Sequence, residues 1–140
     1  MDNVSGFWCI WVDTGGTFTD CLAQSPTGEI SRAKVLSTGR LRATVSMVLA
    51  QDQLVISCST VLPDNFLVGA HLIASTTGIQ VGEILHHDIR SGKCQLHRVG
   101  DHPLSSGELL ELDFGMEAPI LAARLITGTS PERPLPRTAF

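Results

Sequence analysis

Residues 13–20, Asp-Thr-Gly-Gly-Thr-Phe-Thr-Asp, lie between two short apolar runs, residues 7–12 and 21–23. Short apolar runs bounded by turn residues are typical of buried strands, so this octet predicts a tight connection between two paired strands. Glycines at positions 15 and 16 allow the backbone to adopt positive φ and to approach a ligand closely. The chain is therefore expected to open with a β-hairpin.

The same turn has the donors and acceptors of a phosphate and metal site. Backbone N–H groups at Gly15 and Gly16 and the hydroxyl of Thr17 can donate to phosphate oxygens, and the carboxylates of Asp13 and Asp20 can hold Mg²⁺ directly or through water. A Gly-Gly hairpin flanked by Thr and Asp is also a common structural turn, and the residues alone leave both interpretations open. The spacing matches neither the Walker loop nor the dinucleotide-binding G-x-G-x-x-G motif.

The first third of the chain predicts a three-stranded meander followed by a helix. The strands are expected at residues 7–13, 17–24 and 29–36, with turns at 15–16 and 25–28. After them, apolar residues recur at i, i+4, i+7 and i+8, which predicts a helix starting near Ser37 or Thr38. The apolar residues of this pattern are Leu41, Val45, Val48 and Leu49.

The remainder is expected to form a β-rich insertion and a final helix. Residues 51–115 contain four or five β-rich stretches, which suggest a small antiparallel sheet or open barrel. Pro119 and Gly128 bracket a helix over residues 117–127, and the proline-rich tail at 130–136 is expected to be extended without a partner strand. The expected division is 1–50, 51–115 and 116–140.

Composition narrows the possible partners. The 140 residues suffice for one domain, and a net charge of −4 with interspersed signs argues against nucleic acid and anionic membranes. No apolar run approaches the ~18 residues of a membrane span, and the segment 1–6 lacks the basic region of a signal peptide. The four cysteines show no C-x-x-C spacing, which favours buried reduced thiols in a cytoplasmic protein.

Two other groups of residues invite a functional interpretation. His86, His87 and His97 could meet across a hairpin as metal ligands, but adjacent strand residues point to opposite faces, so ordinary polar positions are expected. Trp8 and Trp11 are expected to pack in the core rather than to form a stacking platform for bases.

The octet at 13–20 resembles the opening signature of the hydantoinase A/5-oxoprolinase family, ATP-dependent enzymes that open cyclic amides and belong to the actin-like and sugar-kinase-like ATPase superfamily. Residues 28–30 resemble the family's second hairpin turn, and residues 33–38 resemble the strand after it. Residues 117–124 and 127–129 resemble a helix and loop of certain bacterial members. The resemblance covers residues 7–50 and 116–136 and leaves 51–115 unexplained.

The resemblance implies an α+β fold. It would consist of a three-stranded meander plus helix of an actin-like (ribonuclease H-like) ATPase half-domain, an inserted antiparallel β-rich subdomain, and a C-terminal helix. Asp13 would be catalytic and coordinate Mg²⁺ through water, while Asp20 would shape the metal site or cap the hairpin. The cofactor-binding residues for ATP would be Gly15, Gly16, Thr17 and Thr19. Lys34 matches a frequent lysine of the family and equally suits an outward, solvated strand position.

By this resemblance the chain is the N-terminal segment of a hydrolase in which ATP drives phosphorylation of a cyclic amide. Its partners would be ATP, the small cyclic amide, and a second hydantoinase-type subunit or domain. The segment alone is expected to be inactive, because family members carry the second phosphate loop and the adenosine pocket further along. Two alternatives remain. One is a sugar- or acetate-kinase-like phosphotransferase, and the other is a non-catalytic binding or assembly module that docks through residues 51–115.

Overall fold

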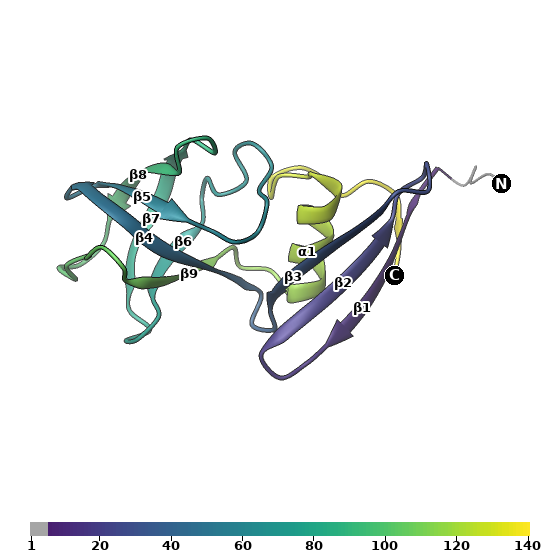
Figure 1. Ribbon diagram of the computed structural model, residues 1–140, viewed down its shortest axis with the longest axis horizontal. Coiled ribbons are helices and arrows are strands. Elements are labelled where there is room, and N and C mark those ends of the chain that lie inside the picture. The colour runs from purple at the N-terminus through teal and green to yellow at the C-terminus, as the bar shows by residue number, and fades with distance from the viewer. Residues whose placement is uncertain (1–5) are drawn as a thin grey trace.

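The computed structural model describes residues 6–140, so most of the segment that argued against a signal peptide lies outside the described residues. The described part consists of a sheet covered by one helix at one end and a barrel at the other, as Figure 1 shows. The ten strands and the helix are β1 (Trp8–Thr14), β2 (Phe18–Gln24), β3 (Ile30–Leu36), β4 (Arg40–Ala50), β5 (Gln53–Ser57), β6 (His71–Ala74), β7 (Gln80–His87), β8 (Lys93–Arg98), β9 (Leu109–Asp113), α1 (Ala118–Thr127) and β10 (Thr138–Ala139).

The sheet has the strand order β10-β1-β2-β3. The three expected strands are present as β1, β2 and β3, paired antiparallel in sequence order. The tail was expected to have no partner strand, and this is wrong: β10 pairs in parallel with β1, and the N–H of Trp8 donates to the carbonyl of Arg137 at 2.8 Å. The pairing joins residues some 130 positions apart, so no local pattern in the tail could indicate it.

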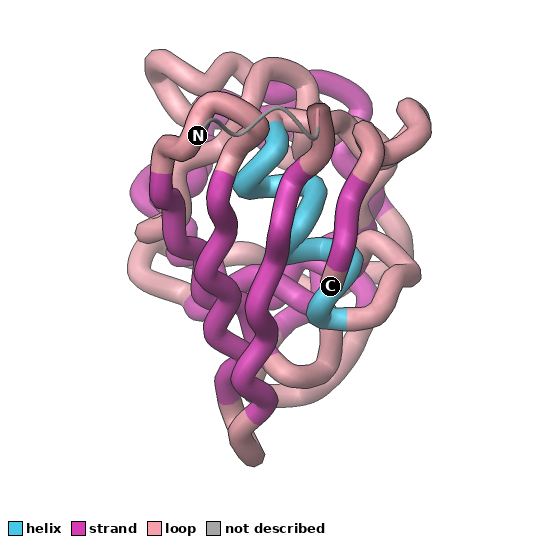
Figure 2. The backbone as a smooth tube through the Cα atoms, turned by 90° about the vertical axis from the view of Figure 1, so that its right-hand side faces the viewer, coloured by secondary structure: helices cyan, strands magenta, loops and turns pink. Residues whose placement is uncertain are grey.

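The helix α1 covers one face of the sheet, as Figure 2 shows with the four strands in front of it. It buries Leu121, Ala122 and Leu125 in the cluster that includes Cys21, Ala23 and Val35 of the strands. The expected boundaries are confirmed: Pro119 lies in the first turn, and Gly128 ends the helix in the left-handed conformation at φ 69°. No element of residues 6–140 covers the opposite face.

On that open face the expectation for the tryptophans is wrong in part. Trp11 is 53% exposed, whereas Trp8 is half-buried and packs against the core. The apolar run 7–12 suggested a strand buried on both faces. The sheet, however, carries a helix on only one side, so every second side chain of β1 faces outward.

The barrel closes in the order β4-β5-β8-β7-β6-β9, with every neighbouring pair antiparallel. Its interior is filled by inward-facing apolar side chains with exposures of 0–5%. They include Leu41, Val45, Leu54, Ile56, Leu72, Val81, Ile84, Leu96, Leu110 and Leu112. An antiparallel β-rich region was expected here, and closure arises because β4 pairs on one edge with β5 and on the other with β9.

The helix expected from Ser37 or Thr38 onward is wrong, because these residues form a turn that leads into β4. Leu41, Ala43 and Val45 are buried and alternate with more exposed residues, which is the period of a strand. A spacing of i, i+4 fits both periods, and bulges beyond Val45 let the apolar residues continue off the strict alternation. Gly39, with φ 82°, turns the chain away from a helical path.

The α+β actin-like half-domain is therefore not the fold that the structure has. The described residues form a mostly β protein, in which a closed six-stranded barrel is the largest element and α1 has 10 residues. The expectation depended on the helix after β3, and the barrel takes that helix's place in the chain. No helix within residues 6–140 has the length and apolar character required to cross a membrane.

Candidate functional site at the tip of the first hairpin

The β1–β2 hairpin divides the predicted site residues between its two faces. Asp13 lies directly opposite Asp20 in the register, and Thr14 lies opposite Thr19. Because side chains alternate along a strand, the two carboxylates share the open outer face, whereas the threonines point toward the face that α1 covers. Thr19 is completely buried, and both aspartates are exposed.

Ser37, at the end of β3, ties the turn to the rest of the sheet. Its hydroxyl donates to the carbonyl of Gly15 at 2.7 Å and lies 2.9 Å from the hydroxyl of Thr19. Its backbone N–H donates to the carbonyl of Thr17 at 2.9 Å. Three hydrogen bonds from one residue therefore hold the tip of the hairpin in a single conformation. Sequence reasoning considered Ser37 only as a helix cap and missed this role, which depends on contacts across 18–22 positions of sequence.

The two glycines of the turn differ in what they offer to a ligand. Gly15 donates its N–H to the carbonyl of Phe18 at 2.9 Å, so that group is already used within the turn. The N–H groups of Gly16 and Thr17 have no acceptor among residues 6–140. A Cβ at Gly16 would meet no atom within 4 Å, which leaves open space beside its backbone. Neither glycine has the positive φ that the sequence allowed.

The carboxylates of Asp13 and Asp20 lack a partner within the described chain. Neither forms an ion pair within 4.0 Å or a side-chain hydrogen bond with a residue of 6–140. Lys34 is opposite Asp20 in the register, but its Nζ lies over the ring of Phe18, 4.5 Å from the ring centre. Like charges directly opposite on neighbouring strands destabilise the pairing. A bound cation would remove that repulsion.

A second hollow lies on the inner side of the same turn. It has a volume of about 450 Å³ and is lined by Thr14, Ser37 and Thr38 together with the first turn of α1. Asp113 and Glu117 also line it, so the hydroxyl-rich wall faces two further carboxylates. Sequence reasoning missed these two residues because about 100 positions separate them from the hairpin.

The residues at the hairpin tip fit Mg²⁺ carried by a nucleotide. Mg²⁺ is commonly bound by one or two carboxylates, with water and phosphate oxygens completing its octahedral shell. Asp13 and Asp20 provide two carboxylates on one face, beside the unpaired N–H groups of Gly16 and Thr17. Residues 6–140 contain no group of three or more His, Cys, Asp or Glu suited to hold a metal by themselves. The fit is therefore to a metal–phosphate complex rather than to a bare ion.

The cysteines and histidines have environments of their own. All four cysteines are free thiols, and burial raises the pKa of Cys94 to about 12. Burial also raises the pKa of Cys21, and the neighbouring charge of Asp20 raises it further. Burial lowers the pKa of His87, against the opposing influence of Asp88.

About half of the chain is similar to a known protein family. Residues 9–79 match the model of a family described as the hydantoinase/oxoprolinase N-terminal region, which is about half of the chain. The match includes the hairpin tip and Ser37, and it extends beyond residue 50 into the first strands of the barrel. Neither a curated protein nor a solved structure matches the chain.

Proposed function

Because this chain belongs to the hydantoinase/oxoprolinase N-terminal family, we propose that it provides the first phosphate-binding turn of an ATP-dependent enzyme that hydrolyses cyclic amides. The observation that carries the proposal is the pairing of two unpartnered carboxylates with open backbone donors. Asp13 and Asp20 lie opposite each other, next to the free N–H groups of Gly16 and Thr17. A purely structural turn needs neither feature.

The predicted residues take different parts in this proposal. Asp13 and Asp20 hold Mg²⁺ through water or directly, and Gly16 and Thr17 donate to phosphate oxygens. Gly15 shapes the turn, since its N–H is already bonded and its Cβ position lies 3.1 Å from the carbonyl oxygen of Phe18. Thr19, buried and bonded to Ser37, acts on the ligand only by holding the turn.

Bound ATP would supply its γ-phosphoryl group to the amide oxygen and leave as ADP. Water would then attack the activated ring carbon, and ring opening would release inorganic phosphate. The chain's share is positioning and charge neutralisation, which are the main protein contributions in phosphoryl transfer. One turn encloses only part of a nucleotide. We therefore expect the 140-residue chain alone to show no 5-oxoproline- or hydantoin-dependent ATP hydrolysis.

Paramagnetic broadening tests the site directly. Mn²⁺ prefers the same oxygen ligands as Mg²⁺ and broadens the NMR signals of nearby nuclei. Titration of the ¹⁵N-labelled chain with Mn·ATP should broaden the amide signals of Gly16 and Thr17 before those of the barrel strands. Asp13→Asn should remove this selective broadening without changing the other amide shifts.

Asp101→Asn is the matched control, because Asp101 is an exposed aspartate in the loop between β8 and β9 whose side chain forms no hydrogen bond or ion pair with residues 6–140. In this variant, Mn·ATP should broaden the amide signals of Gly16 and Thr17 as it does in the unaltered chain. Broadening that centres on the barrel, or that Asp13→Asn leaves unchanged, would remove the hairpin tip from the proposed function.

One observation favours the alternative of a binding module. Met47, Val48 and Leu49 are consecutive apolar residues at the end of β4, and they are 54%, 39% and 45% exposed. An exposed apolar run of this kind is common at protein contacts. If the Mn·ATP titration shows no selective broadening, assembly through the barrel becomes the leading function.

A further inference from the structure

A hollow runs along the free edge of β3. It has a volume of about 660 Å³, and six consecutive strand residues, Ser31–Leu36, line it. Successive side chains of a strand point to opposite faces, so a hollow lined by an unbroken run of residues lies along the strand's edge rather than on either face. We call this hollow the edge groove.

Within residues 6–140, no strand pairs with the second edge of β3. β3 is the last strand in the order β10-β1-β2-β3, and it pairs only with β2 among residues 6–140. The opposite wall of the groove is formed by Arg42 of β4 and the loop Ser59–Val61, and α1 contributes Leu125 and Ile126. Val61 is 90% exposed, so the groove is open to solvent on that side. A segment of extended chain would fit between these walls.

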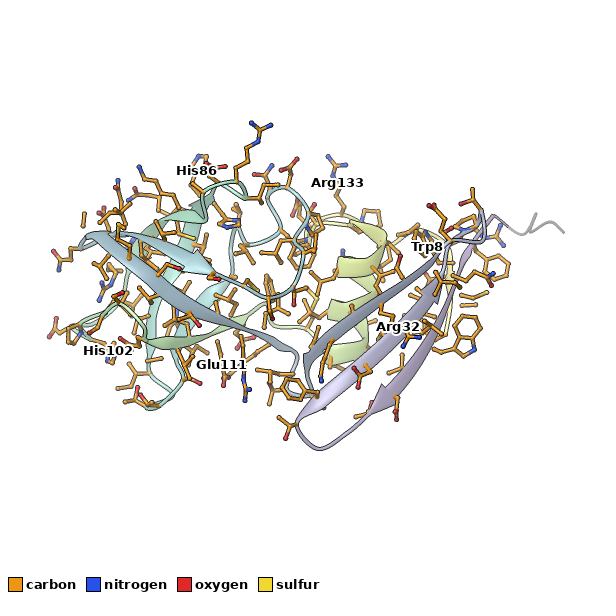
Figure 3. The ribbon with its side chains drawn as sticks, viewed as in Figure 1. Trp8, Arg32, His86, His102, Glu111 and Arg133 are labelled. Atoms are coloured by element: carbon orange, nitrogen blue, oxygen red, sulfur yellow. The ribbon has the colours of Figure 1, made fainter. Side chains whose placement is uncertain are left out.

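Charge along the groove has one sign. Arg32, Lys34 and Arg42 line it, and no aspartate or glutamate of residues 6–140 does, although the chain as a whole has a net charge of −4. None of the three cations forms an ion pair with a residue of 6–140. Lys34 and Arg42 instead both lie over the ring of Phe18, at 4.5 and 5.2 Å from its centre. Figure 3 labels Arg32 among the side chains of the sheet.

The two sides of the groove differ in chemistry. Arg32 and Lys34 are two residues apart, so both project on the open face of the sheet, whereas Leu125 and Ile126 lie on the helix side. A strand added to β3 would place alternate side chains against the cations and the intervening ones against α1. The groove therefore suits a segment in which acidic and apolar residues alternate.

We propose that the edge groove binds an extended acidic segment of a partner protein, which adds to the sheet as a fifth strand beside β3. Main-chain hydrogen bonds give such additions their affinity, and alternate side chains give them specificity. A second copy of this chain does not suit the groove, because pairing two β3 strands would bring the cations of each copy together. The groove adjoins the proposed ATP site, because Arg32 and Lys34 also line a hollow with Asp13 and Asp20, but the proposed peptide binding requires no nucleotide.

Charged residues also protect edge strands from unwanted pairing, so the cations of the edge groove could serve that role instead of binding a partner. A peptide-binding experiment separates the two roles. The probe is a fluorescent peptide of about eight residues in which glutamate and valine alternate. Its anisotropy is followed during titration with the full chain at low ionic strength. Saturable binding is expected, and a peptide of the same composition with its glutamates in one block should bind at least about tenfold more weakly, because only alternation places the charges on one face.

Charge reversal locates the site. The double variant Arg32→Glu/Lys34→Glu should weaken binding at least about tenfold. The matched control Arg90→Glu/Lys93→Glu changes the net charge equally at two exposed positions, in the turn before β8 and at its first residue, and should bind as the unaltered chain does. Urea unfolding of both double variants verifies that each is folded.

Backbone pairing is tested with N-methylated peptides. The N–H groups of alternate residues in a strand face the same edge, so methylating all glutamate amides or all valine amides should abolish binding in one case and preserve it in the other. Equal binding of both methylated peptides, equal binding of the blocked-glutamate peptide, or full affinity of Arg32→Glu/Lys34→Glu would each overturn the proposal. Absence of saturable binding would leave the cations as edge protection and overturn it as well.

Discussion

Gly39, at the start of the barrel, lies close to the backbone of the segment that leads into α1. Its φ is 82°, and a Cβ at this position would lie 2.1 Å from the carbonyl oxygen of Met116 and 3.4 Å from the N of Ala118. We therefore expect Gly39→Ala to destabilise the protein strongly. A left-handed conformation costs an L-residue roughly 1–2 kcal/mol, and forced displacement of well-packed atoms costs about 1–3 kcal/mol more.

Gly28→Ala is the matched control. Gly28 also sits in a turn with positive φ, 94°, but a Cβ there would meet no atom within 4 Å. Only the conformational cost of roughly 1–2 kcal/mol should appear. The difference between the two variants therefore isolates the clash with Met116, and we expect about 1–3 kcal/mol.

Urea unfolding followed by tryptophan fluorescence measures both variants. The free energy of unfolding should fall by about 2–5 kcal/mol for Gly39→Ala, with an unchanged dependence on urea concentration. Such a loss is a large part of the roughly 5–15 kcal/mol that stabilises a typical domain. If the two glycine variants lose equal stability, the close contact between the barrel entrance and α1 is refuted.

Three further outcomes are expected. Ser37→Ala should lower the free energy of unfolding by about 1–3 kcal/mol, because it leaves the buried hydroxyl of Thr19 without a partner. Urea unfolding measures this loss, and the control Ser59→Ala should leave the free energy of unfolding nearly unchanged. Burial raises the pKa of the Cys94 thiol from 9.0 to about 12. Above pH 9 the thiol therefore ionises in the unfolded chain but not yet in the folded one. The free energy of unfolding should fall by about 1.4 kcal/mol per pH unit until the folded thiol ionises near pH 12. In Cys94→Ala, unfolding curves collected from pH 8 to pH 11 should lack that part of the slope. Arg124→Leu removes the donor to the carbonyls of residues 130 and 133, and amide exchange at Trp8 should accelerate as the tail detaches; unchanged exchange would mean that β10 docks without this arginine.

Local patterns predicted those elements whose signals lie within a few residues. The strands β1, β2 and β3 follow from apolar runs between turn residues, and α1 follows from Pro119 and Gly128 at its ends. The helix expected after β3 failed because Leu41 and Val45 satisfy the helical and the strand period together. Pairing with β5 and β9 on the two edges decided between the two periods; β5 follows β4 in a hairpin, whereas β9 lies about 60 positions further along the chain.

Some features of the candidate site could likewise be predicted from nearby residues, and others could not. Asp13, Gly16 and Asp20 could be found from the octet, since a two-strand hairpin places the flanking carboxylates together. The buried position of Thr19, the three hydrogen bonds of Ser37 and the approach of Asp113 and Glu117 could not, because each depends on where distant segments pack.

The sequence by itself determined the opening hairpin, its chemistry and the family to which the chain belongs, since these are properties of contiguous residues. Only the tertiary structure decided that β4 is a strand, that the barrel closes, that β10 returns to β1, and that the edge of β3 stays open. The physical reason is that a strand has no hydrogen-bonding partner within itself. Its stability, its register and its free edge all depend on neighbours that the local sequence does not name.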